Sequence, residues 1–222
     1  MPIALYQSTI QLNYDNLRRD LNSTSGRTRL RSQLRQQLRS SLTPTVVTIP
    51  SDLQDYVDRY AEQVTLLAMA DLDKFFVFQQ QRGFTVGGLP TGFPPLAIMP
   101  RDIKPSNTAI SAIGEGVAGW YIENHLRFRP LSRTIRPVGE GPDFILVNQT
   151  TPASVVLVEV KGTPESSVIA ERLVEAAVPR GLQYTCNVAD RRLPGRYAYL
   201  LLGVLIRQIS DLELWSLRID LQ

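Results

Sequence analysis

The segment Val155-Val156-Leu157-Val158-Glu159-Val160-Lys161-Gly162 decides the fold class and the candidate chemistry of this chain. Its β-branched run predicts a strand, and because side chains alternate along a strand, Glu159 and Lys161 project from one face and Val158 and Val160 from the other. The lack of polar alternation before Glu159 predicts cover on both faces. A charge on such a strand is costly unless it is paired or binds a metal. The two charges are therefore expected either at the exposed end of the strand or in a functional pocket.

A second predicted strand, 143–147, precedes this one and opens with Asp143 after Gly141-Pro142. If the two strands are hairpin neighbours, Asp143 lies opposite the end of the second strand, where Glu159 is. Two carboxylates, with waters and a substrate phosphate, are what Mg²⁺ prefers. A nearby ammonium can orient an attacking water and offset phosphate charge. The alternatives are a turn residue at Asp143 and an exposed Glu159–Lys161 ion pair, which contributes only about 0 to 1 kcal/mol.

The rest of the chain predicts helices and strands in an order typical of a mixed α/β protein, with a central sheet flanked by helices. A run that is apolar on both faces, 197–206, predicts a central buried strand, and 212–221 predicts a terminal strand. Hydrophobic periodicity predicts helices over 27–42, from Ser51 towards Phe78, and over 110–126, 167–178 and 181–192.

Residues 83–107 are rich in Gly and Pro and predict a loop or linker. We therefore expect two parts. Residues 1–105 form a mainly helical N-terminal region, and residues 106–222 contain the motif strands.

Composition excludes several classes of protein. The 222 residues are 43% hydrophobic and 20% charged, which is typical of a globular chain. The longest strongly apolar run, 197–206, has ten residues, whereas about 20 are needed to span a bilayer, so no membrane association is expected. One cysteine (Cys186) and one histidine (His125) exclude a disulfide framework and a multi-Cys or multi-His metal site. We expect a reducing, cytoplasmic location.

Basic residues are unevenly distributed. Residues 1–50 hold seven arginines and two aspartates and thus carry a net charge of +5. These arginines could neutralise phosphates, or they could form a solvated helix face near an acidic neighbour. Only three of the 24 basic residues are lysines: Lys74, Lys104 and Lys161. Because the chain otherwise uses arginine for its positive charges, lysine at 161 favours a functional role at this position.

Pro142-Asp143 followed sixteen residues later by Glu159-Val160-Lys161 resembles the signature of the PD-(D/E)xK, or restriction-endonuclease-like, nucleases. The surroundings match as well: a preceding helix carries an acid in Gly114-Glu115-Gly116, and a helix and a buried strand follow the motif strands. The resemblance covers about 106–206.

The resemblance implies a role for each motif residue. Asp143 and Glu159 would hold a catalytic Mg²⁺ or Mn²⁺, helped by the backbone carbonyl of Val160. Lys161 would act on the nucleophilic water, and Glu115 would be the helix acid that helps to position a metal or water.

Further residues are candidate substrate contacts. Gln183 stands where some exonuclease-like members of the family carry Gln-x-x-x-Tyr, although the fourth residue after it here is Asn187. Four arginines at mostly even spacing could contact phosphates from an extended segment, or they could form a solvent-exposed edge strand: Arg127, Arg129, Arg133 and Arg136.

The function implied is metal-dependent hydrolysis of DNA, more specifically of double-stranded DNA, to 5′-phosphate and 3′-hydroxyl ends. The N-terminal region would bind the duplex, dimerise the protein or cap the core, and a homodimer is one possible assembly. Two alternatives stay open: a catalytically inactive nuclease-fold protein that binds nucleic acid or serves as an assembly module, and cleavage of RNA.

Overall fold

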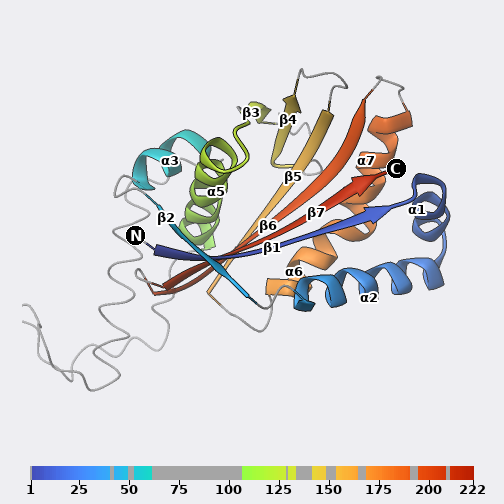
Figure 1. Cartoon of the computed structure of the whole chain (residues 1–222), viewed down its shortest axis with the longest axis horizontal. Helices are drawn as coiled ribbons and strands as arrows, with labels where there is room; N and C mark the ends of the chain where they lie inside the picture. Colours follow the sequence, from blue (N-terminus) through green and yellow to red (C-terminus); the bar gives the residue numbers. More distant parts are fainter. Residues whose placement is uncertain are drawn as a thin grey trace, which may run out of the picture.

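The chain forms a mixed α/β structure with a central mixed sheet flanked by helices (Figure 1). The computed structural model describes residues 2–40, 43–49, 53–61, 107–128, 130–133, 142–148, 154–164, 169–190, 195–208 and 211–222.

The described strands form one seven-stranded sheet in the order β2-β1-β7-β6-β5-β4-β3. The β1/β7 and β5/β6 pairs are parallel, and the other neighbours are antiparallel. The strands are β1 (Pro2–Leu12), β2 (Thr45–Thr48), β3 (Pro130–Arg133), β4 (Phe144–Asn148), β5 (Ser154–Thr163), β6 (Arg196–Gln208) and β7 (Asp211–Leu221).

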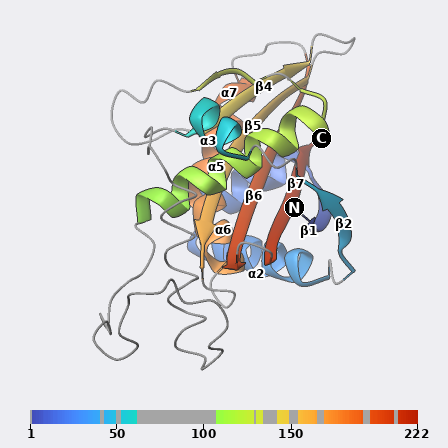
Figure 2. The ribbon, with the colours of Figure 1, turned by 90° about the vertical axis from the view of Figure 1, so that its left-hand side faces the viewer.

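Helices cover both faces of the sheet. The described helices are α1 (Tyr14–Leu21), α2 (Thr24–Ser40), α3 (Leu53–Tyr60), α5 (Asn107–Asn124), α6 (Ile169–Ala176) and α7 (Leu182–Asp190), and a kinked segment, Ala177–Gly181, joins the last two. Figure 2 shows α3 and α5 across one face, with α2 on the opposite side. The parallel β5/β6 pair needs a crossover, and α6 and α7 supply it.

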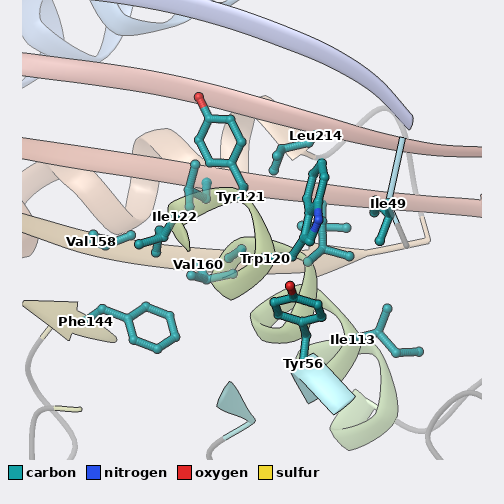
Figure 3. Close-up of a cluster of buried hydrophobic side chains, with 14 of the residues drawn as sticks. Ile49, Tyr56, Ile113, Trp120, Tyr121, Ile122, Phe144, Val158, Val160 and Leu214 are labelled. Carbon is teal, nitrogen blue, oxygen red and sulfur yellow. The ribbon is translucent and has the colours of Figure 1, made fainter. Parts of the chain in front are cut away.

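The core on the α5 face is built from the even-numbered residues of β5. Val158 and Val160 lie between β5 and α5, beside Phe144 of β4 (Figure 3). A Cβ atom on Gly162 would lie 2.5 Å from the carbonyl oxygen of Ile110. Glycine at 162 therefore allows the first turn of α5 to approach β5 directly after Lys161.

The core on the other face is built from odd-numbered residues. Leu157 of β5 and Tyr199 and Leu201 of β6 pack there with α1, α2, α6 and α7. The helical periodicity predicted over 27–42 is confirmed in α2, where Leu30, Leu34 and Leu38, four residues apart, are buried in this cluster.

Most predicted elements are confirmed with small boundary shifts. The two motif strands are β4 and β5, and the run 197–206 is the central strand β6. Helix α2 begins at Thr24, one turn before the predicted 27, and the Ser23 hydroxyl accepts a hydrogen bond from the Gly26 N–H at its start. The helices predicted over 110–126, 167–178 and 181–192 are found as α5, α6 and α7, each with bounds shifted by a few residues.

The expectation for the N-terminus was wrong in one respect: the region begins with a strand. Residues 2–12 form β1, which pairs in parallel with β7 over ten residues from Ile3↔Leu212 to Leu12↔Leu221. Pairing with a strand some 210 residues away along the chain has no local sequence signal, whereas the helical periodicity that follows does.

Two predicted features lie outside the described residues. They are the extension of the helix from Tyr60 towards Phe78 and the linker up to residue 106. Among the described helices, none combines the length and the apolar character needed to cross a membrane.

Candidate functional site

The register of β4 and β5 brings the predicted carboxylates together. The two strands are antiparallel with Phe144↔Val158 as the last recorded pair. One residue further along this register, Asp143 comes opposite Glu159. The two strands are therefore antiparallel neighbours, which is the condition for Asp143 to lie opposite Glu159.

A hydrogen bond attaches the side chain of Asp143 to β5. The carboxylate Oδ2 of Asp143 accepts a hydrogen bond from the backbone N–H of Val160 at 2.6 Å. Val160 stands between Glu159 and Lys161, so the Asp143 carboxylate lies beside the backbone that carries both. This bond also satisfies a backbone donor that β4, which begins at Phe144, does not reach.

Glu159 and Lys161 pair with each other on one face of β5. The Nζ atom of Lys161 donates a hydrogen bond to Oε1 of Glu159. The side chain of Glu159 is 14% exposed and that of Lys161 is 36% exposed. The charges thus occupy a partly shielded position on a strand whose neighbours, Val158 and Val160, are buried. Such a pair is less screened by solvent than a fully exposed one.

Tyr199 lies on the same face as Glu159 and was not singled out from the sequence. It pairs with Leu157 in the β5/β6 ladder and is 1% exposed. Burial raises the pKa of Tyr199 well above its ordinary value, and the negative charges of Glu159 and Asp143 raise it further. Both carboxylates are therefore close enough to Tyr199 to act on the same phenol.

The same tyrosine links the site to the turn between α6 and α7. A Cβ atom on Gly181 would collide with the Tyr199 hydroxyl, so glycine at 181 makes room for the ring. Gln183 is in the first turn of α7, two residues after Gly181, and its Nε2 donates to Oδ1 of Asn187 at 3.2 Å. Within 177–181 the chain kinks, because Val178 has extended dihedral angles, φ −122° and ψ 119°.

Glu115 approaches β5 from the other face. It lies on α5 and is 8% exposed, and its neighbour Gly114 packs against Gly162. In the part of the chain that the structure describes, no three His, Cys, Asp or Glu side chains form a group able to hold a metal ion. Glu115 is thus not gathered with Asp143 and Glu159 into a three-acid set.

The candidate arginines divide by position. Arg133 ends β3 and pairs with Phe144, next to Asp143. Arg127 is exposed beyond the C-terminal end of α5, at φ 55°, whereas the N-terminal end of α5 packs on Gly162. Arg127 is therefore not close to the motif strand end. Arg129 and Arg136 lie outside the described residues.

The N-terminal arginines are largely engaged within the protein. Arg35 of α2 makes a bidentate contact with Glu171 of α6, with Nε–Oε1 and Nη2–Oε2 distances of 2.7 Å. Arg31 pairs with Glu175 at 3.2 Å. Arg18 and Arg29 pair with Asp190 and Asp20. These four arginines therefore lie beside acidic residues of the protein itself, which was the alternative to phosphate binding. The pairs of Arg31 and Arg35 also connect α2 to α6.

The donor set at the strand end fits a hard divalent cation. Asp143 and Glu159 offer carboxylate oxygens, the backbone carbonyl of Val160 is adjacent, and Mg²⁺ is bound in proteins by one or two carboxylates completed by waters and phosphate oxygens. The described part of the site has neither a thiolate nor an imidazole, which softer metals would favour.

No protein-family model, curated protein or solved structure matches this chain. Any functional assignment therefore rests on the chemistry of the residues described above.

Proposed function

We propose that this chain is a divalent-metal-dependent nuclease of the restriction-endonuclease-like type that hydrolyses DNA phosphodiester bonds. The observation that carries the proposal is the hydrogen bond from Val160 to Asp143, which joins the first motif carboxylate to the strand of Glu159 and Lys161. A mixed sheet with helices on both faces, and with both motif strands as antiparallel neighbours, supports it.

Each residue has a role that its position supports. Asp143 and Glu159 would hold the cation, helped by the backbone carbonyl of Val160. A divalent cation held there would supply a coordinated water of lowered pKa and polarisation of the phosphate. Lys161, held beside Glu159, orients the attacking water and neutralises charge that develops on the phosphate oxygens.

The reaction is a displacement at phosphorus. The water oxygen forms a bond to phosphorus, and the bond from phosphorus to the 3′-oxygen breaks. The water loses a proton, and the departing 3′-oxygen gains one. The products are a 5′-phosphate and a 3′-hydroxyl. Glu115, which is buried in the middle of α5, is assigned a supporting role only.

Plasmid nicking tests the proposal. Supercoiled DNA is incubated with Mg²⁺ or Mn²⁺, with and without a chelator, and the wild type is compared with Asp143→Ala and Lys161→Ala. Asp220→Asn is the matched control, because Asp220 is also a partly buried, ion-paired acid, on β7. Metal-dependent nicking that both motif variants lose and Asp220→Asn keeps supports the enzyme. Binding of DNA without nicking in all proteins contradicts it and favours the inactive nuclease-fold module. Cleavage of single-stranded RNA alone, in a parallel assay, would overturn the choice of DNA.

A further inference from the structure

Arg172 on α6 lies next to the motif strand and was not among the residues singled out from the sequence. Its Nη1 atom donates to the carbonyl oxygen of Gly162 at 3.3 Å, and Gly162 directly follows Lys161. The side chain of Arg172 is exposed. A guanidinium group therefore stands at the end of β5, at the backbone of the residue that follows Lys161.

Helix α6 is held in one orientation, which fixes where Arg172 emerges. Ile169, Leu173 and Val174 are buried against the sheet. The bidentate contact from Arg35 to Glu171 ties the helix to α2 on one side. Arg172 is one residue after Glu171, which is about 100° further around the helix, so its side chain contacts β5 and not α2.

The carboxylates near α6 already have partners. Glu171 and Glu175 are engaged by Arg35 and Arg31, and Glu159 is engaged by Lys161. Within the described part of the chain, no carboxylate lies within salt-bridge distance of Arg172. The single contact to a carbonyl uses one of the five N–H donors of a guanidinium, which suits bidentate phosphate recognition.

We propose that Arg172 binds a phosphate of the nucleic-acid backbone next to the scissile phosphate, on the α6 side of the site. This inference rests on the proposed nuclease function. The contact to Gly162 prepositions the guanidinium in the free protein, and the remaining donors take the phosphate oxygens. Arg172 is a substrate-binding group. It does not act on the attacking water or on the leaving oxygen, which the proposed function assigns to the metal site and Lys161.

Salt-dependent binding tests the assignment. The affinity for a short labelled DNA duplex is measured over a range of salt concentrations for Arg172→Ala, Arg172→Lys and Arg19→Ala, each in the Lys161→Ala background. Arg19 is the matched control because it is an exposed arginine on α1. We expect Arg172→Ala to weaken binding about tenfold and to lower the slope of log affinity against log salt by about 1. Arg172→Lys restores the slope, and Arg19→Ala leaves both unchanged.

Cleavage by the same substitutions with Lys161 intact separates this inference from the proposed function. We expect Arg172→Ala to raise KM with little change in kcat. If Arg172→Ala has the same DNA affinity, salt slope and KM as Arg19→Ala while the wild type still nicks DNA, the inference about Arg172 is overturned and the nuclease function is still supported. If the wild type does not nick DNA but Arg172→Ala lowers the slope of log affinity against log salt, the phosphate contact is supported and the nuclease function is contradicted. Absence of DNA binding by the parent protein overturns both.

Discussion

The Asp143 carboxylate accepts a hydrogen bond from the backbone N–H of Val160, seventeen residues further along the chain, at 2.6 Å. This contact performs two tasks at once. It closes the open end of the β4/β5 ladder, and it holds one candidate metal ligand against the strand that carries the other. Stability and the proposed activity would therefore both depend on Asp143, and substitutions can separate the two.

Asp143→Asn and Asp143→Ala are expected to differ in stability but not in activity. Asparagine keeps an acceptor oxygen for the Val160 N–H, whereas alanine leaves that donor without its partner, at a cost of roughly 1 to 3 kcal/mol. Both variants lose a metal ligand and metal-dependent cleavage. Urea denaturation and plasmid nicking measure the two effects. Full cleavage by Asp143→Asn would show that the carboxylate does not hold the cation.

Gly162→Ala is expected to destabilise the protein by roughly 1 to 3 kcal/mol, because a Cβ atom would press on the Ile110 carbonyl and push α5 away from β5. The matched control is Ser154→Ala at the other end of the same strand, where the side chain is half-buried. Thermal denaturation measures both. Equal melting temperatures for Gly162→Ala and Ser154→Ala would contradict the close approach of helix and strand.

Tyr199 is expected to make stability fall as the pH rises above about 10. Its pKa in the folded protein is raised above the ordinary value of 10.0, so the unfolded chain releases the phenol proton first and binds fewer protons than the folded one. Stability from this source is complete below pH 10 and is lost above it. Denaturation of Tyr199→Phe across this range gives a shallower decline. A decline as steep as that of the wild type would contradict the assignment.

The Arg35–Glu171 pair is expected to matter at acidic pH. The hydrogen bonds from Arg35 lower the pKa of Glu171, so the unfolded state takes up a proton before the folded state as the pH falls. The stability that the pair contributes is present above the ordinary pKa of glutamate and is lost below it. Because both side chains are solvent-accessible, the effect is small. Glu171→Gln should flatten the acid limb of the stability profile, and an unchanged limb would contradict this.

The strands of the site could be predicted from the sequence because their signals are local. The valine run of β5 and the apolar run after Asp143 specify two strands, and both strands are confirmed. The leucine stripe of α2 specifies its buried face in the same way.

Other features depend on contacts between distant segments. The pairing of β1 with β7 and the ion pairs from α2 to α6 join residues more than a hundred positions apart. The position of Arg172 depends on the rotation of α6, which these contacts set. Tyr199 reads as an ordinary core residue in an apolar strand until the register places it near two carboxylates.

The most direct test of the central claim is a crystal structure of the protein soaked in Mn²⁺, read by anomalous scattering. The account predicts one strong peak within bonding distance of carboxylate oxygens of both Asp143 and Glu159, with Lys161 directed at the same position. A peak elsewhere, or none at these two side chains while Mn²⁺ is bound at other acids, would contradict it.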